Sequence, residues 1–188
     1  MRRFDIAPNG SPIGFEDMCS LQALGTAQKY TGSYARVARS IPRDFVSGDK
    51  LMETREHFFA ALALSLMVRN GDAHLKNFGV LYSSPVGTVS LAPGYDVVTT
   101  TTYIKNDVPA LSLVGIKKWL TRKVLDRFAA THLSPQPSTV ADTFSRMAAA
   151  VMDTRVMISD YVTYHPEFRE VEGLMIAAWE EGVYGLNG

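Results

Sequence analysis

The longest regular pattern of apolar positions runs from Glu53 to Arg69 and predicts the central helix of the protein. Apolar side chains recur there four and eight residues apart, and alanines fill much of the remaining surface. A helix with so little polar surface should be almost surrounded by the rest of its domain. We expect it to end at Asn70-Gly71, a pair that favours a left-handed backbone. The apolar positions are Phe58, Phe59, Leu62, Leu66 and Met67.

The pattern before this helix is less regular. Residues 6–14 have the composition of a turn or the end of a hairpin. A helical spacing of apolar positions begins at Phe15 and stops at Gly25, a residue typical of helix ends. Residues 29–50 are rich in Gly, Ser, Arg and Pro, so we predict irregular structure with one short helix at Tyr34–Arg39.

Two short alternating runs follow the central helix and predict a β-hairpin. The runs are Phe78–Tyr82 and Thr88–Ala92, joined by a turn at Ser83–Gly87. From about Lys117 onward the pattern is helical, with predicted helices at 117–130, 138–162 and 167–182.

The predicted fold class is therefore mainly α (α+β), a helical bundle into which a small β-hairpin is set. The length of 188 residues suits one domain. Within it we separate a core at 1–115, which carries the motifs described below, from a helical part of the same domain at 116–188.

Composition narrows the class of protein. Lys and Arg together number 19, as do Asp and Glu, so the formal net charge is zero. This balance argues against binding to nucleic acid or to an anionic membrane through bulk charge. The single cysteine, Cys19, cannot form an internal disulfide and suits a reducing compartment. No signal peptide and no apolar run long enough to cross a membrane is visible, so we expect a cytoplasmic protein.

The candidate chemistry lies in Asn70-Gly-Asp-Ala-His-Leu-Lys-Asn77 and at Asp96. Asp72 and Asn77 have the D-x-x-x-x-N spacing of a protein-kinase catalytic loop, and Asp96 follows the hairpin, where such kinases place a metal-binding Asp. Phosphoryl transfer needs a carboxylate that accepts the proton of a hydroxyl group, the role predicted for Asp72. It also needs oxygen ligands for Mg²⁺, the role predicted for Asn77 and Asp96.

Simpler interpretations stand beside this one. A D-x-x-x-x-N spacing alone arises often by chance, because Asp and Asn are common in turns. His74 could only orient the loop through a hydrogen bond to the backbone, and Lys76 could be a solvated surface charge. A metal-dependent hydrolase using Asp72, His74 and Asp96 is disfavoured, since one His and two carboxylates are few ligands for such a site.

The residues also resemble a known family, the HipA-like serine/threonine kinases. The segment Asn70–Phe78 is similar to their catalytic loop, and Leu91-Ala-Pro-Gly-Tyr-Asp-Val97 is similar to their metal-binding segment. Further resemblances are Arg3-Phe4-Asp5 to the hinge between lobes, Glu16-Asp-Met-Cys19 with Lys29-Tyr30 to a family helix and the motif after it, and Pro109-Ala-Leu-Ser-Leu113 to another family segment.

The resemblance implies the C-terminal lobe of a protein-kinase-like fold and phosphorylation of a protein Ser or Thr from ATP with Mg²⁺. It makes Asp72 the catalytic base and Asn77 and Asp96 the metal ligands. The residues it implies for nucleotide binding are Arg3, Phe4, His74, Lys76 and Tyr95. Members of the family commonly act as toxins, which implies a HipB-like helix-turn-helix antitoxin and a protein substrate as partners.

One part of the family pattern has no counterpart in the sequence. Family members carry an N-terminal lobe, with a phosphate-binding loop and a Lys, before the hinge that here begins at Arg3. We therefore expect weak Mg-ATP binding and poor phosphorylation by this chain alone, with the N-lobe supplied by the same gene or by a separate subunit. A fragment, a split kinase and a decayed gene remain open. So does a non-catalytic module that docks an antitoxin or an N-lobe subunit.

Overall fold

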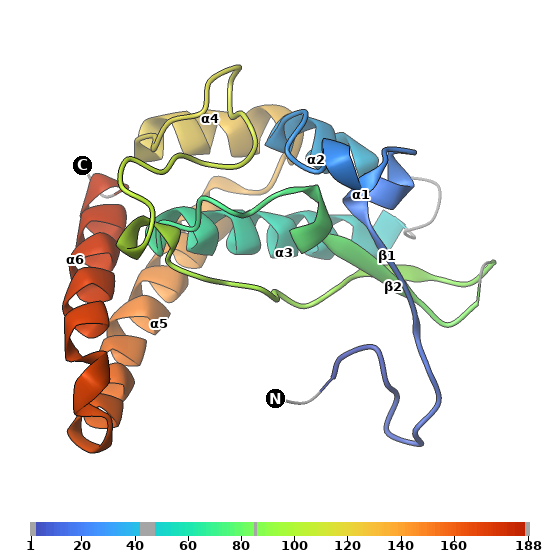
Figure 1. Cartoon of the computed structure of the whole chain (residues 1–188). Helices are drawn as coiled ribbons and strands as arrows, with labels where there is room; N and C mark the ends of the chain where they lie inside the picture. Colours follow the sequence, from blue (N-terminus) through green and yellow to red (C-terminus); the bar gives the residue numbers. More distant parts are fainter. Residues whose placement is uncertain (1–2, 42–47, 85, 187–188) are drawn as a thin grey trace.

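Helix α3 (Gly48–Met67) forms the centre of the computed structural model, which describes residues 3–41, 48–84 and 86–186 (Figure 1). Its apolar face is buried, with no side chain of the predicted set more than 5% exposed. Helices α5 (Pro137–Tyr164) and α6 (Arg169–Gly185) pack against it. The prediction of a central helix is confirmed, and the helix begins five residues earlier than predicted. The buried set is Phe58, Phe59, Leu62, Ala63, Leu66 and Met67.

Shorter helices cover a second side of α3 (Figure 1). They are α1 (Met18–Leu21), α2 (Tyr34–Ser40) and α4 (Arg122–His132). The short helix predicted at 34–39 is confirmed as α2, whereas residues 42–47 of the segment predicted to be irregular lie outside the described residues. The three C-terminal helices are confirmed, although α4 begins five residues after the predicted start at 117.

The small sheet has three strands, one more than the predicted hairpin. Strands β2 (Gly79–Tyr82) and β3 (Val89–Leu91) form that hairpin, and β1 (Gly14–Asp17) adds to the other edge of β2 in antiparallel register. The helix predicted from Phe15 was therefore wrong for residues 15–17. Phe15 lies opposite Leu81 in the sheet, and a strand partner far along the chain overrides a local helical spacing.

The turn that ends α3 also differs from the prediction. The left-handed residue is Arg69, with φ at 55°, and not the pair Asn70-Gly71. A left-handed conformation is strained for a residue with a side chain. Here the Arg69 guanidinium is held by an ion pair of 2.9 Å to Glu181 of α6 and lies 4.9 Å from the ring centre of Trp119. These contacts hold the strained turn in place.

Helix α6 closes the fold against the end of α3. The indole nitrogen of Trp179 donates a hydrogen bond of 2.7 Å to the Thr99 hydroxyl, directly before the 3₁₀ helix η3 (Thr100–Thr102). Gly182 of α6 lies so close to Met67 that a β-carbon there would collide with the Met67 carbonyl. The glycine is therefore required by the approach of the two backbones.

Three further short segments complete the described fold. They are the 3₁₀ helices η1 (Thr26–Gln28), η2 (Leu75–Asn77) and η4 (Pro166–Phe168). The turn predicted in residues 6–14 is confirmed by a bridge between Ile6 and Pro12. Among the helices of the described ranges, none is both long and apolar enough to cross a membrane.

The close approach of α6 to α3 makes a stability prediction. Gly182→Ala should lower the free energy of unfolding by about 2 to 3 kcal/mol, because the new methyl group forces the helices apart. Gly173→Ala in the same helix is the matched control, since a β-carbon at Gly173 meets no atom within 4 Å. It should stabilise the protein by about 0.5 to 1 kcal/mol through helix propensity. Chemical denaturation of both variants measures the difference, and equal effects would contradict the predicted contact.

Candidate functional site

The loop that carries Asp72 is fixed by the side chain of Asn70, the residue directly after the left-handed Arg69. Asn70 is 2% exposed. Its amide oxygen accepts a hydrogen bond of 3.0 Å from the backbone N–H of Asp72, and its amide nitrogen donates one of 3.3 Å to the carbonyl of Asp96. One buried side chain therefore joins the two segments predicted to carry the chemistry.

Gly71 lets the loop approach the segment that follows Asp96. Its backbone N–H donates 2.7 Å to the hydroxyl of Thr100, which in turn donates 3.1 Å to the carbonyl of Arg69. A β-carbon at Gly71 would collide with the carboxylate of Asp107. A side chain at this position would therefore require the Asp107 carboxylate to move.

The carboxylate of Asp72 lies at the surface of the site, with its side chain 40% exposed. Its Oδ1 accepts a hydrogen bond of 2.6 Å from the hydroxyl of Tyr30 and lies 4.0 Å from Nε2 of His74. This hydrogen bond raises the pKa of Tyr30 to about 12, with burial and the charge of Asp72 adding to the shift. A partly exposed carboxylate at the end of a rigid loop can accept a proton from a bound hydroxyl.

His74 is buried beneath Asp72, at 5% exposure. Burial lowers the pKa of His74, and the nearby charge of Asp72 only partly opposes this, so the imidazole is neutral at pH 7. Its Nδ1 has no hydrogen-bond partner among the residues that the structure describes. The contact that shapes the loop comes from the His74 backbone, whose N–H donates 3.0 Å to Oδ1 of Asn77.

Asn77 and Asp96 lie side by side, as the hairpin between them requires. The amide nitrogen of Asn77 donates a hydrogen bond of 2.7 Å to Oδ2 of Asp96, which is exposed. Asp96 has a left-handed backbone with φ at 54°, a conformation that Asp tolerates better than most residues. The two predicted metal ligands are therefore brought together at the surface.

Asn77 and Asp96 offer oxygen atoms of the kind that Mg²⁺ takes together with phosphate, but in this structure the amide nitrogen of Asn77, and not its oxygen, faces Asp96. Within the described ranges, no group of three or more His, Cys, Asp or Glu side chains could hold a metal ion. Mg²⁺ commonly keeps several waters and is held by one or two carboxylates plus substrate phosphates. Asp96 supplies such a carboxylate, and the Asn77 oxygen has a second lone pair available beside its bond to His74.

Lys76 and Tyr95 are the residues directly before the two predicted metal ligands, and they connect the two segments. The Tyr95 hydroxyl donates 2.6 Å to the carbonyl of Lys76, and burial raises the pKa of Tyr95. The Lys76 ammonium pairs with the carboxylate of Asp17 at the end of β1, and this hydrogen bond raises the pKa of Lys76. Lys76 is therefore an ion-paired residue, and the role predicted for it in nucleotide binding stays a prediction.

Phe4 reaches the same face from the N-terminal segment. Its ring centre lies 5.4 Å from that of Tyr95 and 5.7 Å from that of Phe15, and these three rings form an aromatic cluster beside Asp96. Arg3 instead pairs with Asp5 at the surface, with its side chain 73% exposed. The structure thus brings Phe4 to the site, and it directs the Arg3 guanidinium to Asp5.

Sequence reasoning missed three residues that shape the site. Tyr30 and Asp17 lay in segments quoted only for their resemblance, and neither had an assigned role. Asn70 was taken as a helix stop, although its polar side chain follows a very apolar helix. The hydrogen bonds of Asn70 to both segments are seen only in the folded structure.

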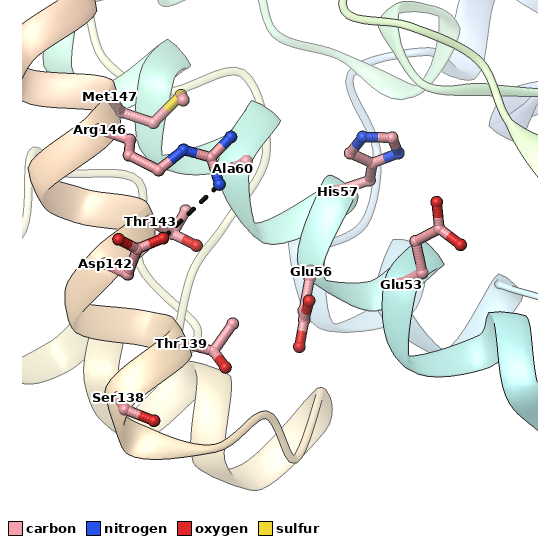
Figure 2. A pocket seen from close by; sticks show the side chains of 10 residues that line it. All are labelled: Glu53, Glu56, His57, Ala60, Ser138, Thr139, Asp142, Thr143, Arg146 and Met147. Atoms are coloured by element: carbon pink, nitrogen blue, oxygen red, sulfur yellow. Dashed lines mark ion pairs between the residues drawn. The ribbon is translucent and has the colours of Figure 1, made fainter.

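A cavity of about 480 Å³ lies elsewhere, between residues 53–60 of α3 and residues 138–147 of α5 (Figure 2). None of the residues predicted for the site lines it. Its carboxylates come from Glu53, Glu56 and Asp142, and Arg146 pairs with Asp142 at 3.6 Å. This excess of negative charge disfavours the binding of a nucleotide phosphate in the cavity.

Comparison with known proteins places these features in a family. The model of the HipA-like C-terminal domain matches residues 1–155. Over 120 residues the chain is 31% identical to a protein of Sinorhizobium fredii (strain NBRC 101917 / NGR234) named "Putative kinase Y4dM", an alignment that covers 63% of this chain and 28% of that protein.

A solved structure shares the fold. A chain of the Shewanella oneidensis MR-1 toxin–antitoxin complex of HipA, HipB and operator DNA matches with a TM-score of 0.59 and 18% identity. The match covers 95% of this chain and 47% of that chain. This chain therefore spans less than half the length of either relative.

The pair of Asp17 and Lys76 makes a prediction about pH. Burial favours a higher pKa for Asp17, but the hydrogen bonds from Lys76 and the Ser20 backbone outweigh it and hold the pKa below its ordinary value. The folded state therefore binds fewer protons than the unfolded state near pH 4, and this stabilisation is present above that pH and lost as pH falls. Asp17→Asn keeps the helix cap but should lower the free energy of unfolding by about 1 kcal/mol at pH 7.

Denaturant unfolding at pH 7 and pH 3 measures this effect. The difference between the Asp17→Asn variant and the wild type should shrink at the lower pH. Asp126→Asn is the control, because Asp126 pairs with Arg122 on the surface of α4 and is 46% exposed, so it should change stability by less than about 0.5 kcal/mol. A difference that stays constant between the two pH values would refute the assigned ion pair.

Proposed function

The chain belongs to the family of HipA-like C-terminal domains, and on that premise we propose that it is the catalytic lobe of a kinase. The reaction is transfer of the γ-phosphoryl group of Mg-ATP to a Ser or Thr hydroxyl of a protein. The observation that carries the proposal is the pairing of two segments through Asn70, with Asn77 and Asp96 in direct contact at 2.7 Å. A protein that only needed a docking surface would have no use for this arrangement.

Each residue has a defined part in the proposed reaction. Asp72 accepts the proton of the substrate hydroxyl. The hydroxyl oxygen attacks the γ-phosphorus, and the bond between the γ-phosphorus and the ADP oxygen breaks. Asn77 and Asp96 hold Mg²⁺, which when bound neutralises charge on the phosphates. His74, neutral and buried, supports the loop from below without adding a positive charge.

The phosphate groups need further positive charge, and we propose that it comes from protein outside this chain. Two of the lysines near Asp72 are already engaged: Lys76 pairs with Asp17, and Lys117 donates 3.1 Å to the carbonyl of Tyr30. The nearby Lys29 lies over the ring of Tyr30, 4.9 Å from its centre. An N-lobe that grips the nucleotide, as the family resemblance implies, would complete the site.

The surface beside Asp72 supports a protein as the substrate. The segment after Asp96 exposes large apolar side chains, each between 42% and 73% exposed. Two points tie it to the site: Asp107 lies against Gly71, and Ser112 bonds to the carbonyl of Gly32. Exposed large apolar side chains that gather near a site are a feature of surfaces that contact other proteins. The residues are Val97, Val98, Tyr103, Ile104, Val108, Val114 and Ile116.

We also propose a helix-turn-helix antitoxin as a partner. The support is the solved relative, which is a toxin–antitoxin complex of HipA with HipB and operator DNA. The family resemblance implies that the helix-turn-helix antitoxin supplies the contact with DNA. The zero net charge of this chain agrees with that division of roles.

Transfer of radiolabelled phosphate from ATP, with Mg²⁺ present, tests the proposed function. The chain is assayed alone and together with the protein encoded directly upstream of it. Asp72→Asn and Asp96→Asn should each reduce transfer at least about 100-fold, because one removes the proton acceptor and the other a metal ligand. Asp153→Asn, on an exposed position of α5, should transfer phosphate like the wild type.

Two results would contradict the proposal. One is the absence of transfer under every pairing. The other is transfer that persists at the wild-type rate in the Asp72→Asn and Asp96→Asn variants. Stable binding of an upstream protein without any transfer would favour the alternative of a non-catalytic docking module.

A further inference from the structure

Tyr30 makes a contact with Asp72 that neither the family pattern nor the proposed reaction explains. Its hydroxyl donates 2.6 Å to Oδ1 of Asp72 from a position 42 residues earlier in the chain. The side chain is 44% exposed, so the hydroxyl could be hydrated by solvent at little cost. Its direction toward one carboxylate oxygen is therefore a specific feature of the site.

Three contacts hold Tyr30 in this place. The backbone carbonyl of Lys29 accepts 3.1 Å from the N–H of Leu75, and the ammonium of Lys117 donates 3.1 Å to the carbonyl of Tyr30. The Tyr30 ring meets His74 edge to face, with ring centres 5.0 Å apart. Because both Leu75 and His74 belong to the Asp72 loop, the tyrosine and the carboxylate are held by the same backbone.

The two oxygens of the Asp72 carboxylate have different surroundings. Oδ1 is occupied by Tyr30 and is the oxygen nearest to His74. No hydrogen bond to Oδ2 is present in the part of the chain that the structure describes. A carboxylate held through one oxygen cannot rotate freely, so the other oxygen points in a fixed direction.

We propose that Tyr30 is a positioning residue, which fixes the Asp72 carboxylate so that Oδ2 accepts the proton of the substrate hydroxyl. The role rests on the proposed function. Proton transfer requires the acceptor within hydrogen-bond reach of the hydroxyl, and a fixed acceptor avoids the cost of ordering it during the reaction. In this role Tyr30 acts on the reaction only through Asp72, to which its hydroxyl bonds.

Tyr34 shows what a purely structural tyrosine looks like in the same region. It is 1% exposed, and its hydroxyl donates 3.1 Å to the backbone carbonyl of Ala73. Tyr34 thus supports the loop from the core, whereas Tyr30 reaches the functional carboxylate from the surface. The difference in exposure and partner separates the two roles.

The first arm of the test measures the contact without any enzyme assay. Nuclear magnetic resonance of ring-labelled tyrosine, with Tyr30→Phe for assignment, follows ionisation of each phenol. The hydrogen bond to Asp72 raises the pKa of Tyr30 to about 12, so Tyr30 should still be mostly protonated at pH 11, about one pH unit above the ordinary pKa of a tyrosine side chain. In Asp72→Asn the charge of the carboxylate is gone, and Tyr30 should ionise at a lower pH than in the wild type.

The second arm measures phosphate transfer with the chain in its active pairing. Tyr30→Phe keeps the ring on His74 and removes only the hydroxyl. It should lower kcat by about 10-fold with an unchanged KM for ATP, because the lost hydroxyl bonds to Asp72 and the ring contact with His74 is kept. Tyr164→Phe is the control, since Tyr164 on α5 is 82% exposed and should behave as the wild type.

The outcomes separate this inference from the function on which it rests. Ionisation of Tyr30 at the same pH in the wild type and in Asp72→Asn overturns the contact. A wild-type kcat in Tyr30→Phe, with Asp72→Asn inactive, overturns the positioning role but leaves the kinase in place. Absence of transfer by every protein, with the titration as expected, overturns the proposed function and with it the role, while the contact stands.

Discussion

The arrangement of the site depends on the buried amide of Asn70. This group accepts a hydrogen bond from the Asp72 backbone and donates one to the Asp96 carbonyl. One partner comes before the hairpin in the chain and the other after it. An amide carries a donor and an acceptor on one plane, which a carboxylate or an apolar side chain of similar size lacks. Its loss would leave buried backbone groups without partners, and such groups are costly.

The strained turn before Asn70 shows how that amide reaches its place. Arg69 adopts a left-handed backbone, and its side chain is held by Glu181 and Trp119. The strain of one residue at the end of α3 is offset by contacts with a helix more than a hundred residues later. The direction in which the loop leaves α3 is therefore set by tertiary packing and not by the local sequence alone.

Much of the fold and part of the site could be predicted from the sequence, for a physical reason. The central helix has a long apolar period, and the order of helix, polar loop and hairpin places Asp72, Asn77 and Asp96 in one local unit. Strand β1 could not be predicted in the same way, because Phe15 finds its partner in Leu81 and its spacing also suits a helix. The mainly helical class was confirmed, and the sheet gained a strand.

The contacts that refine the site lie beyond local patterns. The Tyr30 hydroxyl and the Asp17 carboxylate reach the loop from 42 and 59 residues away, and no spacing rule connects such pairs. Helix α6 extends this dependence to the last described part of the chain, through Trp179, Glu181 and Gly182. A chain emerging from the ribosome cannot make these contacts until α6 has been synthesised. The loop that carries Asp72 therefore acquires its full set of partners only after α6 has been synthesised.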